Sequence, residues 1–263
     1  MKTLSNENLT ITVKSFGAEL ASIKSNKSGR EYLWQANPAF WKRHSPILFP
    51  IVGGLNNGEC KFDGNVYKMS QHGFARDMDF ELLSETETEV FYSLKSDKET
   101  LAKYPYAFQL IVGYRLKENG VEVIWEVRNE GETTMCFQIG AHPAFNYADF
   151  ESNDEVQGYF GFDKTESINY ILLGEGGCAV PDVDYSLPLQ DGLLTIDKHT
   201  FDKDALIIEN SQVEKVVLFD KGKNPYLSVH FDAPLVGLWS PPSKDAPFVC
   251  IEPWYGRCDR VGF

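Results

Sequence analysis

Apolar and polar residues alternate along much of the chain, in short runs that are separated by turn residues. The clearest run is 121–127, which follows the turn residues Asn119 and Gly120. Successive side chains of a strand point to opposite faces, so this run predicts a strand with one buried and one solvent-facing side. Looser alternation in 9–13 and 20–23 predicts an antiparallel pair that turns at Gly17.

Further short apolar runs predict strands at 80–83, 90–94, 108–116, 136–139, 213–219, 226–231, 236–239 and 248–251. Only 96–103 has helical composition. In 149–194 the polarity rises and the periodicity fails, which predicts long excursions away from the sheets. The segment 33–49 is rich in tryptophan, proline and other aromatic residues, has no clear period, and is expected to wrap a cleft.

The spacing of these runs predicts the fold class. Short strands at near-regular intervals, almost no helix, and no Gly/Ser-rich linker or internal repeat are typical of an all-β protein. We therefore expect a single antiparallel β-sandwich domain that spans residues 1–263.

Composition and charge narrow the classes of function. The net charge is −13 and the pI about 4.9, so the chain repels nucleic-acid backbones and anionic membranes. The five cysteines include no C-x-x-C pair, and no leader or run of 18 apolar residues is present. These features predict a cytoplasmic protein with reduced thiols and with no nucleic-acid or membrane partner.

His142 is the first candidate for chemistry. It follows an apolar run and precedes Pro143, which cannot donate to a strand ladder, so its side chain is expected at a strand end that faces a cleft. A core histidine bonded to a backbone carbonyl is an equally good interpretation of His142 alone.

His72 and Arg76 form a second candidate group. Gly73 and Ala75 keep the backbone slim, so a ligand could approach closely, and the imidazole and guanidinium offer hydrogen bonds to hydroxyl groups. The alternative is a turn that contains an ion-paired arginine.

Glu252 is the third candidate. It lies between the apolar residues 249–251 and the rings of Trp254 and Tyr255, where partial loss of water would raise the pKa of its carboxyl and make it a usable base. The alternative is a structural glutamate paired with Arg257. His72, His142 and Glu252 could in principle bind a metal, but their spacing has no metal-site signature, and we expect neither a metal nor a cofactor.

Three motifs together resemble the aldose 1-epimerase (galactose mutarotase-like) family, in its LacX-like branch. They are 71–76 (Gln-His-Gly-Phe-Ala-Arg), 140–146 (Gly-Ala-His-Pro-Ala-Phe-Asn) and 252–256 (Glu-Pro-Trp-Tyr-Gly). The segment 41–50 (Trp-Lys-Arg-His-Ser-Pro-Ile-Leu-Phe-Pro) also fits this branch. The resemblance covers the chain from about residue 10 to its end.

The resemblance implies a large twisted antiparallel β-sandwich with an open cleft, and interconversion of the α and β anomers of a free aldose without a cofactor. Glu252 matches the base that takes the proton of the C1 hydroxyl, and His142 the acid that protonates the ring oxygen. His72 matches a second histidine on the ring-oxygen side. Other matches would hold the sugar: Arg76 or Arg43, Asp204 with Asp202 as the alternate, and Trp254.

The chain departs from the family pattern in two places. Relatives often carry an arginine directly after Gly53, where this chain has Gly54. Relatives also continue into a further strand, whereas this chain stops eleven residues past Glu252, so a C-terminal strand is expected to be missing.

Two other functions compatible with this pattern are a hexose-6-phosphate mutarotase, with Lys42, Arg43 and Arg76 on the phosphate, and a sugar-binding protein that does not catalyse. The preferred aldose is left open, as is the choice between a monomer and a homodimer.

Overall fold

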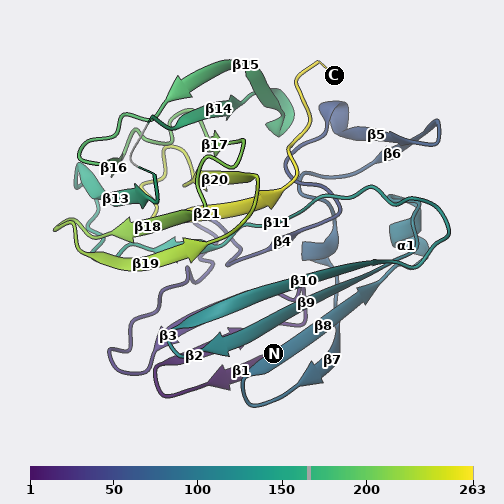
Figure 1. Cartoon of the computed structure of the whole chain (residues 1–263), viewed down its shortest axis with the longest axis horizontal. Coiled ribbons are helices and arrows are strands. Elements are labelled where there is room, and N and C mark those ends of the chain that lie inside the picture. The colour runs from purple at the N-terminus through teal and green to yellow at the C-terminus, as the bar shows by residue number, and fades with distance from the viewer. Residues whose placement is uncertain (165–166, 263) are drawn as a thin grey trace.

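A computed structural model describes residues 1–164 and 167–262, and antiparallel strands dominate it (Figure 1). The N-terminal part forms two sheets, which lie in the lower half of Figure 1. The first has the order β1-β2-β3 and the second the order β10-β9-β8-β7. Their strands are β1 (Lys2–Ser5), β2 (Leu9–Val13), β3 (Leu20–Ser25), β7 (Glu81–Glu85), β8 (Glu89–Lys95), β9 (Phe108–Lys117) and β10 (Gly120–Asn129).

The C-terminal part, together with β4, forms two further sheets in the upper half of Figure 1. One sheet has the order β15-β14-β17-β20-β21-β11-β4, with β12 also paired to β21, and the other has the order β16-β13-β18-β19. Their strands are β4 (Ile47–Leu48), β11 (Ile139–Ala141), β12 (Ala144–Asn146), β13 (Val156–Phe162), β14 (Asn169–Leu173), β15 (Ala179–Ser186), β16 (Leu193–Asp197), β17 (Leu206–Ile208), β18 (Lys215–Phe219), β19 (Pro225–His230), β20 (Leu235–Trp239) and β21 (Phe248–Tyr255).

The remaining elements are short. The hairpin β5 (Glu59–Phe62) and β6 (Asn65–Lys68) stands apart from the sheets in Figure 1. One α-helix, α1 (Lys98–Leu101), and three 3-10 turns, η1 (Asn56–Gly58), η2 (Ala75–Asp77) and η3 (Glu175–Gly177), complete the described residues. None of the helices among the residues that the structure describes is long and apolar enough to cross a membrane.

The all-β antiparallel sandwich predicted from the sequence is confirmed. The alternating run at 121–127 lies in β10, and the expected helix is limited to α1. The expectation of excursions off the sheets between 149 and 194 is wrong outside residues 165–166, which lie outside the described part. That region contains β13, β14, β15 and the start of β16.

Aromatic and aliphatic side chains from the sheets pack into one large buried cluster. Phe49 is completely buried there and its ring lies 5.1 Å from that of Phe108, so the core extends from β9 to the chain that follows β4. Burying large rings in this way contributes most to the stability of such a fold. Two smaller clusters flank β21, and the candidate site residues lie beside them.

Candidate active site

Strand β21 carries Glu252 and Trp254 on one face of its sheet, and glycines on both neighbouring strands make room for them. Gly237 of β20 is paired with Glu252, and Gly140 of β11 with Trp254. A Cβ atom at Gly140 would lie 2.9 Å from Trp254 Cδ1, and one at Gly237 would lie 3.2 Å from Trp254 Cζ2. The indole therefore occupies space that any larger residue at these positions would crowd.

His142 follows β11 at the point where the pairing is interrupted. As expected, β11 ends at Ala141 and the chain pairs again only in β12, beyond Pro143. The backbone N–H of His142 donates to the carbonyl of Pro46 at 3.1 Å. The ring Nε2 lies 3.3 Å from Glu252 Oε2, so two residues far apart in sequence meet in space.

His72 completes the group of titratable residues. Its ring is perpendicular to that of His142, with 5.5 Å between the centroids. The backbone N–H of Gly53 donates to His72 Nδ1 at 3.0 Å, so the neutral ring carries its proton on Nε2 and can donate from there. The φ of His72 is +66°, a region that non-glycine residues seldom adopt.

The role expected of Gly73 from the sequence is wrong. A Cβ atom there would lie 2.2 Å from the carbonyl oxygen of Phe49, and its φ is +71°. The glycine therefore allows two backbone segments to approach each other, rather than a ligand to approach the chain.

Burial sets the protonation of the pair. It raises the pKa of the Glu252 carboxyl well above its ordinary value, and the charge of Asp204 raises it further. Burial lowers the pKa of His142 to about 3, with the positive charge of Arg76 acting in the same direction. At a pH between these two pKa values the imidazole is neutral and the titratable proton of the pair resides on Glu252.

His72 is also neutral. Burial, followed by His142 and Arg76, lowers its pKa well below the ordinary value. Three buried polar atoms at the site have no hydrogen-bond partner, namely His142 Nδ1, Glu252 Oε2 and Trp254 Nε1. Because unpaired buried polar atoms are costly, a ligand with hydroxyl groups could satisfy what the protein leaves unsatisfied.

Arg43 and Arg76 lie at the edge of the site. Arg76 Nη2 donates to the carbonyl of Gln71 at 2.7 Å, while its Nε is buried without a hydrogen-bond partner. Arg43 Nη2 pairs with Asp77 Oδ1 at 2.8 Å. Both guanidinium groups help to lower the pKa of His72, so their charge is felt at the site.

The structure distinguishes the two candidate aspartates. Asp204 is exposed, and its charge acts on Glu252. Asp202 instead pairs with His199 Nδ1 at 2.8 Å on the surface. Arg257, the alternative partner for Glu252, binds Glu209 at 3.1 Å. Glu252 is therefore not the partner of a structural arginine.

Two aromatic residues at the site were not singled out from the sequence. The ring of Trp41 is stacked on His142 at 4.7 Å, and the ring of Trp239 meets the same imidazole edge-on at 5.4 Å. The signals for Trp41 were its place in the aperiodic aromatic segment expected to wrap a cleft and in the segment 41–50 that fits the LacX-like branch. The pair is nearly closed off, because Glu252 is 1% and His142 7% exposed.

Gly54 stands where the family pattern led us to expect an arginine. A Cβ atom there would lie 2.0 Å from the carbonyl oxygen of Gly176, and the Gly54 N–H donates to Gly177 at 3.1 Å. Turn η3 thus fills the space beside Gly54. A side chain at this position would require η3 to move.

His142, Cys250 and Glu252 each offer one ligand atom, and these atoms lie within 4.8 Å of one another. Burial raises the pKa of the Cys250 thiol well above its ordinary value, so a metal would have to displace protons from both Cys250 and Glu252. The expectation that no metal is used stays a prediction.

An open cavity of about 1430 Å³ lies on the other face of β21. Pro253 and Tyr255 line it, whereas the alternate residues Glu252 and Trp254 face the site. The strand therefore separates the candidate site from this cavity.

Comparison with known proteins gives a consistent result. A family model described as aldose 1-epimerase matches residues 1–258. The chain is 34% identical to protein LacX (plasmid) of Lactococcus lactis subsp. lactis over 276 residues, which cover 96% of this chain and 87% of the relative.

Among solved structures, a galactose mutarotase related enzyme from Lactobacillus acidophilus superposes with a TM-score of 0.93 at 36% identity, covering 100% of this chain and 87% of that one. A galactose mutarotase-like protein from Lactobacillus casei ATCC 334 gives a TM-score of 0.90 at 31% identity, with 100% and 90% covered.

Proposed function

Because the chain belongs to the aldose 1-epimerase family, we propose that it interconverts the α and β anomers of a free hexose by opening and reclosing the sugar ring. The observation that carries the proposal is the approach of His142 Nε2 to Glu252 Oε2 at 3.3 Å, in a buried setting that raises the pKa of the carboxyl and lowers that of the imidazole. One acid and one base are what anomerisation needs.

The two groups act on one carbon of the sugar. The C1 hydroxyl oxygen and the ring oxygen are both bonded to C1, so adjacent side chains can reach them together. Glu252 takes the hydroxyl proton, His142 delivers a proton to the ring oxygen, and the bond from C1 to the ring oxygen breaks to give the aldehyde. After rotation about the C1–C2 bond, closure on the other face returns both protons.

This assignment requires the single proton of the pair to move from Glu252 to His142 when sugar binds. The charge-separated form is unfavourable in the dry site, because burial disfavours both charges. Hydroxyl groups that hydrogen-bond to the carboxylate offset part of this cost. His72, as a neutral donor from Nε2, supports the ring oxygen.

The sugar is held from the edge of the site. Asp204 is exposed and its charge acts on Glu252, which supports a role for it as a hydrogen-bond acceptor for the sugar. Arg76 contributes donors, and the Trp254 N–H, which lowers the pKa of the nearby Glu252 carboxyl, makes no hydrogen bond of good geometry. Aromatic faces beside a polar pair are well suited to a pyranose ring, which has apolar C–H faces and polar edges.

A free hexose is favoured over a hexose 6-phosphate. Asp77 pairs with Arg43 at 2.8 Å and lies 3.8 Å from Arg76 Nε, so an internal carboxylate already neutralises part of the positive charge. Asp204 adds a negative charge near the pair. A dianionic phosphate would have to displace these contacts.

Polarimetry of freshly dissolved α-D-glucose and α-D-galactose tests the proposal. We expect the protein to accelerate the decay of optical rotation, and Glu252→Gln to reduce this acceleration by about 10²- to 10⁴-fold. Glu209→Gln is the matched control, because it removes a carboxylate paired with Arg257 outside the site. Sugar binding by calorimetry without acceleration in the wild type would instead indicate a sugar-binding protein.

A further inference from the structure

The turn between β2 and β3 is packed against the segment that carries Arg76. Its residues Gly17 and Ala18 both have positive φ, of 69° and 44°. The N–H of Gly17 donates to the carbonyl of Met78 at 2.7 Å, and a Cβ atom at Gly17 would lie 2.9 Å from the carbonyl oxygen of Arg76. Only glycine allows this close approach.

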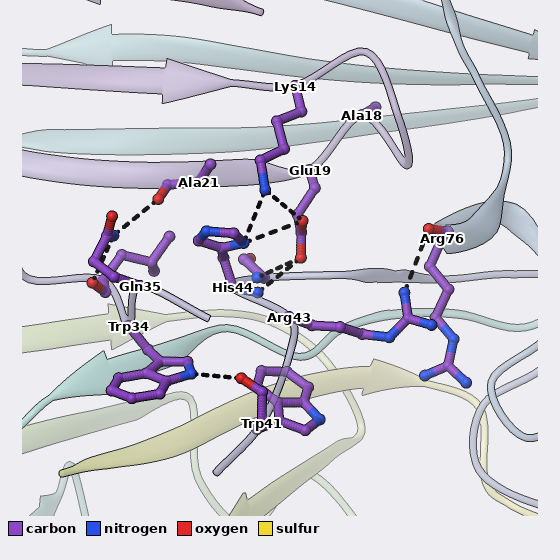
Figure 2. A network of polar contacts seen from close by, with 12 residues as sticks. Lys14, Ala18, Glu19, Ala21, Trp34, Gln35, Trp41, Arg43, His44 and Arg76 are labelled. Carbon is purple, nitrogen blue, oxygen red and sulfur yellow. Dashed lines mark hydrogen bonds and ion pairs between the residues drawn. The ribbon is translucent and has the colours of Figure 1, made fainter. Parts of the chain in front are cut away.

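Glu19, at the end of the same turn, binds a second segment of the site (Figure 2). Its Oε1 accepts hydrogen bonds from the backbone N–H groups of His44 at 2.8 Å and Ser45 at 3.1 Å. Its Oε2 lies 3.3 Å from His44 Nδ1 and 3.7 Å from Lys14 Nζ. One carboxylate thus holds two successive backbone amides, a side chain and a cation.

These bonds involve an ionised carboxylate. Burial opposes the charge, yet the hydrogen bonds from the side chain and backbone of His44 lower the pKa of Glu19 below its ordinary value. Hydrogen bonds to a charged acceptor are about twice as strong as neutral ones. The side chain of Glu19 is 12% exposed, so little water competes for it.

The segment that Glu19 holds reaches the acid–base pair. Residues 34–46 contain no strand, so specific hydrogen bonds fix their course. Trp41 is stacked on His142. The carbonyl of Trp41 accepts a hydrogen bond from Trp34 Nε1 at 2.8 Å, as Figure 2 shows. Beyond the residues that Glu19 binds, Pro46 accepts the backbone N–H of His142 at 3.1 Å.

The same segment is also connected to Arg76. Arg43 Nη1 donates to the carbonyl of Arg76 at 3.5 Å, as Figure 2 shows. The turn thus contacts one segment through Gly17 and the other through Glu19. Both segments carry residues of the site.

We propose that Glu19 is a positioning residue of the active site, which holds the segment 41–46 so that Trp41 stays stacked on His142 and Arg43 stays against the Arg76 loop. The inference builds on the proposed mutarotase function. Glu19 touches no reacting atom and acts through the residues it holds.

Three variants test the role of Glu19. Glu19→Ala removes the acceptor for both amides, and we expect kcat/KM to fall by about 10- to 100-fold, because small displacements of reacting groups are costly. Glu19→Asp keeps the charge but is one methylene shorter, and should be similarly impaired. Glu19→Gln keeps an oxygen that accepts both N–H groups but loses the charge that strengthens these bonds, and should recover part of the activity.

Tyr114→Phe provides a matched control. The hydroxyl of Tyr114 donates to the carbonyl of Ala18 at 2.7 Å, so this variant weakens the same turn without touching the Glu19 bonds. If loss of stability alone explained the effect, Tyr114→Phe would lower kcat/KM as much as a Glu19 variant of equal melting temperature. That result, or wild-type kcat/KM in both Glu19→Ala and Glu19→Asp, would overturn the proposal.

A second measurement does not depend on catalysis. The chain has five histidines, so their ring signals can be resolved by ¹H–¹³C NMR with labelled histidine. The stacked Trp41 ring shifts the His142 signals, and we expect this shift to be reduced in Glu19→Ala and Glu19→Asp but kept in Tyr114→Phe. If the wild type accelerates no aldose, the proposed function fails while the NMR result still decides the positioning. Unchanged His142 signals in both Glu19→Ala and Glu19→Asp would exclude the proposed positioning role of Glu19.

Discussion

Nε2 of His142 lies 3.3 Å from Oε2 of Glu252, and burial shifts the pKa of each group toward its neutral form. The two residues therefore titrate as one unit that holds a single proton over a wide range of pH. A second proton leaves the pair without a base, and loss of the first leaves it without an acid. The lower limit is set by His142, whose pKa is about 3, and the upper limit by the raised pKa of Glu252.

The pH dependence of kcat/KM follows from this. We expect no inflection near the ordinary pKa of histidine, 6.5, or near that of glutamate, 4.5, since the pKa of His142 is about 3 and that of Glu252 is well above 4.5. The rate should fall on the alkaline side, where Glu252 loses its proton. Polarimetric rates, corrected for the spontaneous reaction and measured across this pH range, test the prediction. An inflection at pH 6.5 would contradict a pair that holds one proton.

Stability should increase when Glu252 is replaced by glutamine. The folded-state pKa of Glu252 is raised, so the unfolded chain releases a proton that the folded chain retains, and stability falls as the pH rises above 4.5. Glutamine cannot ionise. We expect Glu252→Gln to be more stable than the wild type at neutral pH. The gain should be about 1.4 kcal/mol for each pH unit between the ordinary pKa of glutamate and the pH of the measurement, as long as Glu252 stays protonated in the folded chain.

Urea unfolding at two pH values, one near neutral and one near the ordinary pKa of glutamate, measures the difference in stability between Glu252→Gln and the wild type. The difference should be smaller at the lower pH. His142 has the opposite sign, because its lowered pKa causes a loss of stability as the pH falls from 6.5 toward 3. Glu209→Gln removes an ion-paired carboxylate and should gain no stability at either pH. Equal stability of Glu252→Gln and the wild type at neutral pH would show that Glu252 is ionised in the fold.

His72→Asn should separate folding from catalysis. Asparagine tolerates positive φ, and its side-chain oxygen can accept the Gly53 N–H in place of Nδ1. The donor on Nε2 is lost. We expect stability within about 1 kcal/mol of the wild type and a rate lower by about 10- to 100-fold. A wild-type rate would mean that His72 only supports the backbone of Gly53.

The two aspartates of the loop before β17 allow a matched comparison. Asp204→Asn removes a charge that raises the pKa of Glu252, so the alkaline limb of the pH profile should move to lower pH and KM should rise. Asp202→Asn disrupts only a surface pair with His199 and should change neither quantity. Comparable effects of both substitutions would remove Asp204 from the sugar site.

Local patterns in the sequence predicted the fold well where the strands are regular. The alternation of 121–127 marks β10, where Val121, Trp125 and Val127 on one face are half-buried against the core, although Val123 on the same face is exposed. Strands β13 and β14 escaped prediction. Register shifts interrupt their pairing, and Gly158 and Gly161 in β13 leave gaps in the apolar pattern.

The candidate site was predictable only in part. His142 and Glu252 stand out because each is a polar residue at the end of an apolar run. Trp41 and Glu19 do not stand out, since their roles depend on contacts with residues distant in sequence. No local pattern indicates that Glu19 holds the backbone of His44. That information resides in the packing of the turn against the site.

The alternation of β21 has a consequence for how this strand can change. Glu252 and Pro253 point to opposite faces, one toward the acid–base pair and the other toward the large cavity. Deleting or inserting a single residue upstream of Glu252 within the strand would exchange the two sets of side chains. Residues on the cavity face can therefore be substituted one at a time without moving Glu252, whereas a change in strand length would turn Glu252 away from His142.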